Sequence, residues 1–301
     1  MWTTENIPDQ SGKTIIITGA NSGIGFETAL ALYRSGADVI ITGRNEKSIN
    51  LASNKILALN GSGSITPDIL DLSSFKSIQA FAKNFLSNHD KVDILINNAG
   101  VMTPPESTTA EGFEMQFGVN FLGHFVLTAH LFPLLKNAKS ARIVTLSSGA
   151  HKFADKVDYS NLRVENGYDA NREYAISKLA DLQFAVELQK RLDQAGLDML
   201  SLAAHPGVTK TGLARHMPEA DYNAALEQFG ELMPVWQGAL PSLYAATSPN
   251  IKKAGYYGPD GENELKGYPA PAQLSDSAMD GKLGEELWKF AEEATGLIFP
   301  F

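Results

Sequence analysis

The sequence predicts an α/β fold, a doubly wound parallel sheet with helices on both faces. Short runs rich in β-branched residues alternate with segments of helical periodicity, which is the pattern of parallel strands joined by crossover helices. A glycine-rich turn connects the first such run to the first helical segment. No Pro/Gly/Ser-rich linker or internal repeat divides the 301 residues, so we expect one domain over residues 1–301.

Six strand-like runs follow one another along the first two thirds of the chain. They cover residues 13–18, 39–42, 65–70, 92–97, 142–147 and 199–205. Pro67 lies inside the third run, and because proline cannot donate to a strand ladder, we expect this strand at a sheet edge. The doubly wound strand order 3-2-1-4-5-6 also puts the third strand at an edge. A turn-rich strand end is expected at 255–261.

Helical segments fill the gaps between these runs. One helix is expected to begin near Ile24, and another covers 75–85, where apolar residues recur every three or four positions and Ser73 or Ser74 can act as N-cap. The apolar stretch 119–135 predicts a buried helix, because four polar or proline residues interrupt it and make it a poor membrane span. Residues 280–295 predict a last amphipathic helix.

Composition and charge exclude several classes of function. The net charge of -9 argues against a nucleic-acid partner, because binding to backbone phosphates needs a basic surface. The chain has no cysteine, and its six histidines form no ligand motif, so we expect neither a disulfide framework nor a metal site. Residues 1–10 lack the pattern of a secretory signal. A cytoplasmic protein without a transmembrane segment is therefore expected.

The strongest local signal is T-G-A-N-S-G-I-G at residues 18–25, between an apolar strand and a helix. A pyrophosphate needs backbone N–H groups at close range and the partial positive charge of a helix N-terminus. Gly19, Gly23 and Gly25 would remove the side chains that stand in the way. A purely structural glycine-rich turn is the alternative, and the position between strand and helix favours the binding loop.

Further motifs follow in a fixed order. They are N-N-A-G at 97–100, Asn120, Ser147-Ser148, Y-A-I-S-K at 174–178 and P-G-V-T-K-T at 206–211. Together with the glycine-rich turn, they resemble the motifs of the short-chain dehydrogenase/reductase family over about two thirds of the chain. The resemblance implies a Rossmann-like fold and reversible hydride transfer between a nicotinamide cofactor and an alcohol or carbonyl group.

Tyr174 and Lys178 are four residues apart and share one face of a helix. A phenol has an ordinary pKa of about 10, and a nearby ammonium favours its ionised form. Such a pair can exchange a proton with an alcohol or carbonyl oxygen. In isolation this spacing is more often a partly buried tyrosine beside a solvated lysine, but the surrounding motifs favour the catalytic pair.

The resemblance implies four catalytic residues. Tyr174 would be the general acid in carbonyl reduction and the base in alcohol oxidation, and Lys178 would also hold the nicotinamide ribose. Ser148 would hydrogen-bond the substrate oxygen, while Ser147 would support the strand end. Asn120 would anchor a water that links Lys178 to solvent, a role compatible with an amide that satisfies local helix backbone.

The resemblance also implies a set of cofactor contacts. Asp71 would contact the adenine or cap the next helix, and Asn98 would support the sheet centre. Val208 and Thr211 would meet the carboxamide and phosphate ends of the cofactor. The full set is Gly19, Asn21, Ser22, Gly23, Ile24, Gly25, Arg44, Asp71, Leu72, Asn98, Ala99, Gly100, Tyr174, Lys178, Pro206, Gly207, Val208 and Thr211.

The end of the second strand-like run predicts NADP(H) rather than NAD(H). NAD enzymes place a carboxylate there, which accepts from the ribose 2'-hydroxyl. Here Gly43 leaves room, and the guanidinium of Arg44 can bind a phosphate bidentately. A surface arginine in an ordinary turn is the alternative.

Two irregular segments are candidates for setting specificity. The stretch between Ser148 and Tyr174 is longer than in the common form of the family, as in its retinol-dehydrogenase-like and protochlorophyllide-reductase-like branches, and S-S-G-A-H at 147–151 resembles the former. Residues 152–171 would border the substrate site or form a plain surface loop. Residues 212–236 break the alternation, and we expect a lid there that orders over cofactor and substrate.

The expected substrate is a small or medium-sized apolar carbonyl compound or the corresponding alcohol. A sugar-nucleotide epimerase or dehydratase shares the fold and the Tyr-Lys pair, but its usual glycine spacing is tighter. A redox sensor that binds the cofactor without turnover usually lacks the tyrosine or the lysine, so the four residues present here favour an enzyme. Family members commonly dimerise through the helix around 117–135, which leaves a homo-oligomer open.

Overall fold

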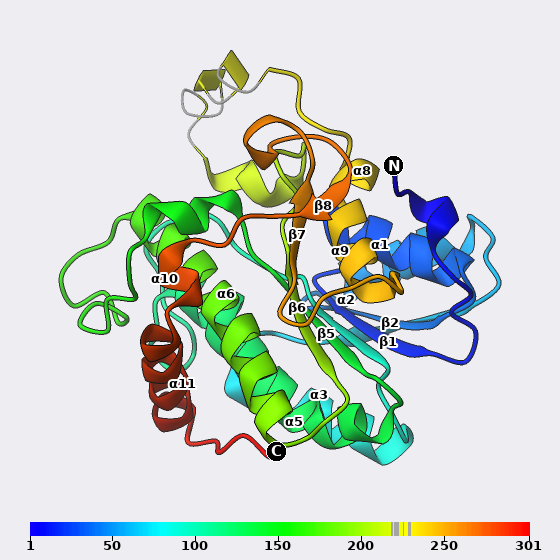
Figure 1. Cartoon of the computed structure of the whole chain (residues 1–301), viewed down its shortest axis with the longest axis horizontal. Helices are drawn as coiled ribbons and strands as arrows, with labels where there is room; N and C mark the ends of the chain where they lie inside the picture. Colours follow the sequence, from blue (N-terminus) through cyan, green and yellow to red (C-terminus); the bar gives the residue numbers. More distant parts are fainter. Residues whose placement is uncertain (218, 220–222, 225, 228–229) are drawn as a thin grey trace.

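A largely parallel sheet runs through the centre of the molecule in the computed structural model, with helices on both sides (Figure 1). The structure describes residues 1–217, 219, 223–224, 226–227 and 230–301. The strand order is β3-β2-β1-β4-β5-β6-β7-β8, and every neighbouring pair is parallel except β7 and β8. The predicted doubly wound fold is therefore confirmed.

The six predicted strands are confirmed, with ends that differ by up to two residues, and the predicted strand end at 255–261 contains β7. Pro67 lies in β3 at one edge of the sheet, as expected. The short strand β8 was not predicted. The strands are β1 Thr14–Thr18, β2 Asp38–Gly43, β3 Ser64–Ile69, β4 Ile94–Asn97, β5 Arg142–Leu146, β6 Leu200–Ala204, β7 Tyr256–Pro259 and β8 Pro269–Pro271.

The predicted helices are also present, and their caps are local. Ser74 caps α3 by accepting a hydrogen bond from the Ser77 amide, and Asp280 caps α11. The described helices are η1 Thr4–Asn6, α1 Gly23–Arg34, α2 Glu46–Leu57, α3 Phe75–Asn88, α4 Met115–Phe117, η2 Gly118–Leu122, α5 Gly123–Asn137, η3 Gly149–Phe153, α6 Ala170–Gln194, η4 Gly212–His216, α8 Val235–Gly238, α9 Leu240–Thr247, η5 Glu262–Glu264, α10 Asp276–Met279 and α11 Gly281–Thr295.

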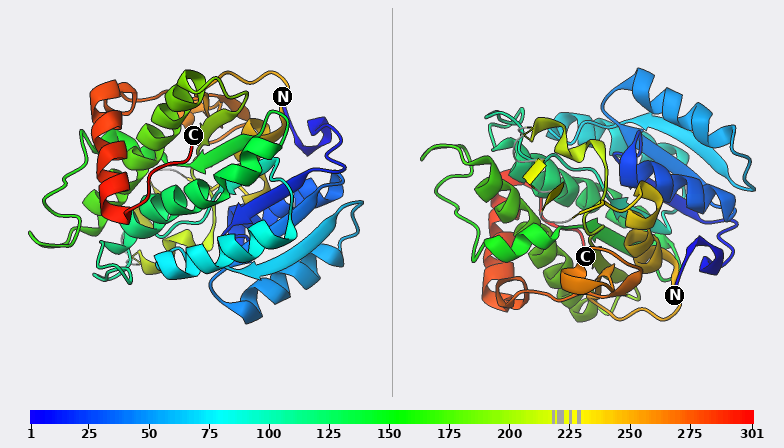
Figure 2. Two further views of the ribbon diagram at one scale, coloured as in Figure 1. Left: turned by 90° about the horizontal axis from the view of Figure 1, so that it is seen from below. Right: turned by 90° about the horizontal axis from the view of Figure 1, so that it is seen from above.

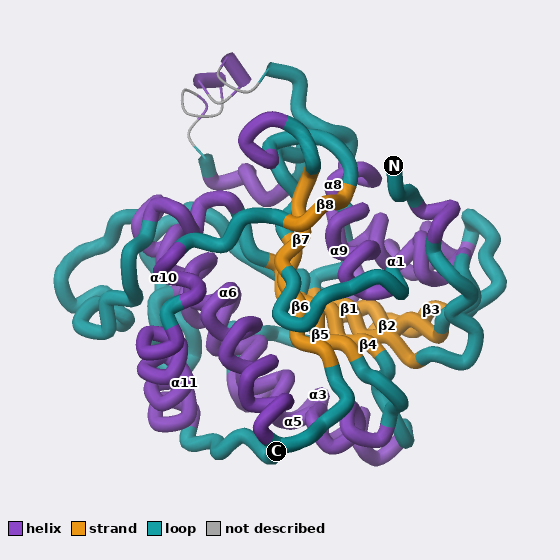
Figure 3. Tube along the Cα trace, in the orientation of Figure 1, coloured by secondary structure: helices purple, strands orange, loops and turns teal. Residues whose placement is uncertain are grey.

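The sheet separates two apolar cores, because successive residues of a strand point to opposite faces. In β1, Ile16 belongs to the core formed with α3, α5, α6 and α11, whereas Ile15 and Ile17 belong to the core formed with α1, α2 and α9. Figure 2 shows helices on both sides of the strands, and Figure 3 shows the strands side by side between them.

The predicted buried helix is the continuous segment Met115–Asn137, formed by α4, η2 and α5. Among the described residues it is the one helix long and apolar enough to cross a membrane. However, 89% of its most apolar window is buried inside the protein, and core helices pass the same test of length and composition. The expected cytoplasmic location stays a prediction.

The C-terminal tail after α11 returns to the surface of α5. Phe299 is buried, and its ring lies 4.9 Å from that of Phe132, 5.7 Å from that of Phe125 and 4.9 Å from that of Trp288, measured between ring centres. Helix α11 itself packs along α6 (Figure 1). The last helix and the tail thus close the core on this side of the sheet.

Candidate active site

A cleft of about 1650 Å³ opens where the parallel strands end. Its walls come from the turn after β1, the loops after β4, β5 and β6, and the beginning of α6. In open parallel sheets, ligands bind at the carboxyl ends of the strands. Every predicted cofactor residue lines this cleft, and so do Ser148, Tyr174 and Lys178, whereas Asn120 does not.

The glycine-rich turn packs tightly against the loop that follows β4. A Cβ atom on Gly19, whose φ is +66°, would lie 2.8 Å from the Ala99 Cα. A Cβ atom on Gly25 would lie 2.5 Å from the side-chain nitrogen Nδ2 of Asn98. These two glycines therefore permit close packing within the protein, rather than clearing a path for a ligand as we expected. A Cβ atom on Gly23 would have more room, because its nearest neighbour would be the Thr211 side chain at 3.8 Å across the cleft.

Thr18 and Asn98 hold this turn in place. The Asn98 side chain donates to the carbonyl oxygen of Thr18 at 2.6 Å, and the Ala99 amide donates to the Thr18 hydroxyl at 2.9 Å. The same hydroxyl lies 2.9 Å from Nε2 of His124 on α5. Asn98 thus joins the ends of β1 and β4, which agrees with its predicted role at the sheet centre.

His124 is fully buried, and its Nδ1 lies 2.7 Å from the carbonyl oxygen of Asn120. Burial lowers the pKa of His124 to about 4, so the ring is neutral at neutral pH. Nδ1 therefore donates to the carbonyl, and Nε2 accepts from the Thr18 hydroxyl. Sequence analysis did not assign this histidine a role, because its partners come from two distant segments.

Tyr174 and Lys178 lie near the beginning of α6, where Asp169 caps the helix through the amides of Asn171 and Arg172. Both side chains are buried, and Nζ of Lys178 lies 5.9 Å from the centre of the Tyr174 ring. The same Nζ donates to the carbonyl oxygen of Leu146 at 2.9 Å. Lys178 is thus not the solvated lysine of the alternative interpretation.

Asp181 is the second partner of Lys178, with Oδ2 at 2.7 Å from Nζ. Sequence analysis did not single out this carboxylate. The available signal was its position, since residues three apart share a helix face. On exposed helices, acidic residues often follow a lysine at that spacing. The spacing alone therefore does not indicate a buried ion pair, and the burial of the two side chains is known only from the structure.

The two serines after β5 differ in the way that the sequence predicted. Ser147 is buried and donates to the carbonyl oxygen of Lys178 at 2.7 Å, which ties the strand end to α6. Ser148 is half-buried, lines the cleft and accepts from the Ala150 amide at 3.2 Å. Its hydroxyl hydrogen is therefore not used in that bond.

Asn120 lies in the π-helical turn η2, a local widening that is frequent at functional sites. Its amide group donates to the carbonyl oxygen of Val101 at 3.0 Å and to Ser177 Oγ at 2.9 Å, and it accepts from the Val101 amide at 2.8 Å. The side chain thus fastens the loop after β4 to α6. Asn120 also lies near Lys178. A Cβ atom on Gly100 would be 3.4 Å from Asn120 Oδ1 and 3.8 Å from Lys178 Nζ.

The end of β2 brings Arg44 to the rim of the cleft, and the next residue, Asn45, caps α2 by accepting from the Ser48 amide at 2.9 Å. A Cβ atom on Gly43 would meet its nearest atom at 3.5 Å. At the end of β3, Asp71 accepts from the amide and the hydroxyl of Ser73. Ser74, and not Asp71, is therefore the cap of α3.

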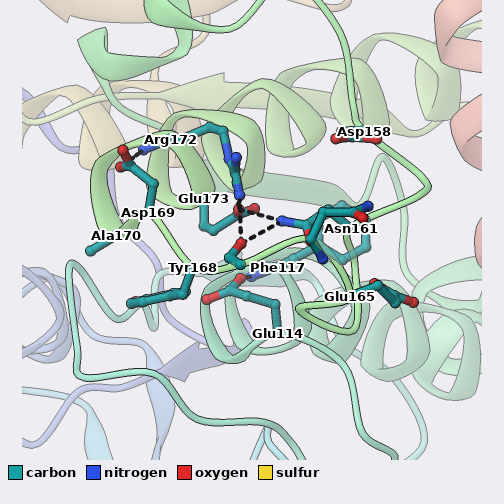
Figure 4. A network of polar contacts seen from close by, with 12 residues as sticks. Glu114, Phe117, Asp158, Asn161, Glu165, Tyr168, Asp169, Ala170, Arg172 and Glu173 are labelled. Atoms are coloured by element: carbon teal, nitrogen blue, oxygen red, sulfur yellow. Dashed lines mark hydrogen bonds and ion pairs between the residues drawn. The ribbon is translucent and has the colours of Figure 1, made fainter.

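The inserted segment 152–171 is anchored to α6 by a buried polar network (Figure 4). Asn161 donates to the Glu173 carboxylate at 3.0 Å, and Arg172 Nε donates to the same oxygen at 2.8 Å. Tyr168 donates to the carbonyl oxygen of Pro104 at 2.6 Å. The two ends of the segment line the cleft, through Lys152, Phe153 and Asp169, while its middle is a packed loop away from it. The ends of the segment thus border the cleft, and a contact with the substrate stays a prediction.

Part of the predicted lid also lines the cleft, through Leu213, Arg215 and Met217 of the segment 212–236. Residues 218, 220–222, 225 and 228–229 of that segment lie outside the described residues. The lid therefore stays a prediction.

Comparison with known proteins gives consistent relatives. A sequence model of the short chain dehydrogenases matches residues 13–221. Human retinol dehydrogenase 14 is 36% identical over 307 residues, which covers 95% of this chain and 87% of that protein. Human retinol dehydrogenase 11 is 42% identical over 241 residues, covering 80% of this chain and 74% of that protein.

Solved structures agree with these relatives. The crystal structure of an uncharacterized protein from Mycobacterium paratuberculosis superposes with a TM-score of 0.82 at 36% identity, over 100% of this chain and 99% of that one. The NADP complex of Pseudomonas aeruginosa RhlG superposes with a TM-score of 0.68 at 23% identity, over 85% of this chain and 97% of that one. At that lower identity the likeness concerns the fold alone.

Proposed function

The chain belongs to the short-chain dehydrogenase/reductase family, in its retinol-dehydrogenase-like branch, and on this basis we propose that it transfers a hydride between NADP(H) and an alcohol or carbonyl compound. Membership of the family makes the chain an oxidoreductase. The observation that carries the finer proposal is that Ser148, Tyr174 and Lys178 line one cleft together with every predicted cofactor residue.

The cleft suits a dinucleotide and a substrate together. Its volume of about 1650 Å³ exceeds the roughly 300–1,000 Å³ of most small-molecule sites. The turn at Gly23 opens helix α1, and the Ser22 side chain makes no capping bond there, so backbone N–H groups remain for a pyrophosphate. Bound nicotinamide supplies or accepts the hydride, and the protein contributes geometry and proton transfer.

The reacting groups of the protein would then divide the work. Ser148 orients the substrate oxygen through the hydroxyl hydrogen that its bond to Ala150 leaves unused. Tyr174 gives its proton to that oxygen during carbonyl reduction and takes a proton from it during alcohol oxidation. Lys178, buried beside the Tyr174 ring, supplies the positive charge that favours the ionised phenol.

The choice of NADP(H) rests on the end of β2. Gly43 provides no carboxylate for a 2'-hydroxyl. Arg44 lies at the rim of the cleft, and Ser48, four residues later, lines the same wall. An arginine binds a phosphate through two parallel hydrogen bonds. This pair of features supports a 2'-phosphate as the group that the site recognises.

The substrate that we propose is an apolar aldehyde, ketone or alcohol. Val101, Met102, Phe153, Leu213 and Met217 provide apolar surface at the cleft. The similar curated proteins are named retinol dehydrogenases, and a retinoid is accordingly the first substrate to try.

The direct test follows NADPH absorbance with a panel of retinal, short and long aldehydes, ketones and quinones. We expect consumption of NADPH with at least one apolar carbonyl compound. A panel without turnover, from a protein that binds NADPH tightly, would contradict the proposal and indicate a redox sensor. Conversion of a sugar nucleotide without net use of cofactor would instead indicate an epimerase.

A further inference from the structure

Asp181 and Lys178 form an ion pair inside the protein. Their side chains are 1% and 6% exposed, and the carboxylate Oδ2 lies 2.7 Å from the ammonium Nζ. The other carboxylate oxygen, Oδ1, is buried without a hydrogen-bond partner among the described residues. A buried carboxylate with a single partner is costly to keep, and such groups gather at functional sites.

The pair lies directly behind the cleft. Lys178 lines it, and Tyr174 stands one turn earlier on the same face of α6. Lys178 Nζ also donates to the carbonyl oxygen of Leu146, the last residue of β5. The ammonium is therefore fixed from two sides, by the strand end and by the carboxylate.

The other titratable groups that face the pair are neutral at neutral pH. Burial lowers the pKa of His124 on α5 to about 4, and the charge of Lys178 acts in the same direction. Burial raises the pKa of Tyr256 on β7 well above its ordinary value, and the charges of Glu264 and Asp181 act in the same direction. Asp181 is thus the counter-charge for Lys178 at this site.

Two opposing effects act on Lys178. Burial lowers the pKa of Lys178 and is the largest single effect, but the charge and the hydrogen bond of Asp181, together with the charge of Tyr174, outweigh it and raise the pKa. Without the carboxylate, only Tyr174 would oppose the effect of burial on the pKa of Lys178, and buried lysines can lose their proton near neutral pH. A neutral Lys178 would no longer favour the ionised form of the neighbouring phenol.

We propose that Asp181 is a positioning residue that keeps the ammonium of Lys178 charged and fixed beside Tyr174. The inference rests on the proposed function of the cleft, because it concerns the charge on which proton exchange by Tyr174 depends. Asp181 itself lies outside the cleft wall and acts through Lys178.

The first experiment needs no turnover. Lysine labelled with ¹³C at Cε reports its own protonation by NMR, and Lys178→Met identifies the signal. We expect wild-type Lys178 to titrate above pH 10.5, the ordinary lysine value. In Asp181→Asn the titration should fall by about 1 to 3 pH units, and in Asp181→Glu it should stay closer to the wild type. Glu293→Gln, which removes a surface carboxylate paired with Lys289 at 3.8 Å, is the matched control and should change nothing.

The second experiment follows the pH profile of kcat for alcohol oxidation. In Asp181→Asn the decline on the alkaline side should begin at a pH about 1 to 3 units lower than in the wild type, with KM for the alcohol unchanged. Asp181→Glu should restore the wild-type profile. A uniform loss of rate at all pH values would indicate a merely structural residue.

The outcomes separate this inference from the proposed function. A Lys178 titration that is the same in wild type and Asp181→Asn would overturn the inference, whatever the activity. If Asp181→Asn does not fold, a wild-type Lys178 that titrates below 10.5 would overturn it as well. A wild-type protein without turnover on any substrate contradicts the proposed function, and the NMR titration still decides the role of Asp181.

Discussion

The side chain of Tyr174 is almost fully buried, yet it forms part of the cleft wall beside Ser148. Tyr174→Phe removes the hydroxyl and little volume, so NADPH binding should be unchanged. General acid and base catalysis contributes about 10²- to 10⁴-fold, and we expect kcat to fall by at least about a hundredfold. Steady-state kinetics and NADPH titration check the two halves of this prediction.

The matched control is Tyr244→Phe, which removes a tyrosine hydroxyl from α9 outside the cleft. Its rate should equal that of the wild type. A Tyr174→Phe variant that keeps more than about a tenth of the wild-type rate would remove Tyr174 from the mechanism, since it falls short of the acid-base contribution.

Arg44 offers a test of cofactor choice at a single side chain. A hydrogen bond to a charged group contributes roughly 1.5–3 kcal/mol, so Arg44→Ala should reduce the preference for NADPH over NADH by about ten- to a hundredfold. The measurement is kcat/KM with each cofactor. Arg34→Ala, at the C-terminal end of α1 and outside the cleft wall, should leave the ratio unchanged. Equal kcat/KM values for the two cofactors in the wild type would refute the assignment to NADP(H).

At the scale of elements, His124 connects helix α5 to the end of β1. The ordinary pKa of histidine is 6.5, and burial lowers that of His124 to about 4 in the folded protein. Between these values the unfolded chain binds a proton that the folded protein excludes, so stability falls as the pH falls from about 6.5 to 4. The contribution of this one group is about 3 kcal/mol, at 1.36 kcal/mol for each unit of pKa.

We therefore expect the free energy of unfolding of wild type to decline between pH 7 and pH 4.5 more steeply than that of His124→Gln. Urea unfolding at the two pH values measures both slopes. His216→Gln changes an exposed histidine and should keep the wild-type slope. Parallel pH dependence in wild type and His124→Gln would show that the pKa of His124 is the same in the folded protein and in the unfolded chain.

The elements that the sequence could predict are those specified by local signals. β1, β2 and α1 follow from periodicity and from the glycine-rich turn, and the ordered motifs placed the cleft residues along the chain. β8 has only three residues, two of them proline, and it forms by pairing with β7, so no local pattern marks it. The bonds of Asn120 to Val101 and Ser177 likewise join three segments, and no spacing along the chain encodes them.

The position of the inserted segment could not be predicted from the sequence either. Its length identified it as an addition, and the sequence left open whether it borders the site or covers the surface. Its position is set by Asn161, a buried amide that bonds to Glu173 on α6 and accepts from the Asn166 amide. A buried asparagine cannot be told from an exposed one by residue type, and the anchor therefore became visible only in the fold.

At the scale of the whole molecule, the C-terminal tail closes the core around α5. Phe299→Ala deletes a buried ring among Phe125, Phe132 and Trp288, and such deletions cost about 3–5 kcal/mol. The tail does not line the cleft, so kcat should stay unchanged at temperatures where the variant is folded. Urea unfolding and steady-state kinetics measure the two effects.

The neighbouring residue provides the control. Ile298 is 87% exposed, and Ile298→Ala should leave the urea midpoint within error of the wild type. Similar midpoints for Phe299→Ala and wild type would mean that the tail contributes nothing to the folded state.

Both edge strands of the sheet, β3 and β8, contain proline, and proline at a sheet edge affects aggregation. Pro67 interrupts the row of amide donors on β3, and in β8 Pro269 and Pro271 leave Ala270 as the one residue with an N–H group. An extended segment of another chain adds most readily to a sheet edge where donors and acceptors alternate without a break, and proline interrupts such a row. Neither edge of this sheet offers such a row. We therefore expect the native protein to resist fibril growth by strand addition at either edge of this sheet.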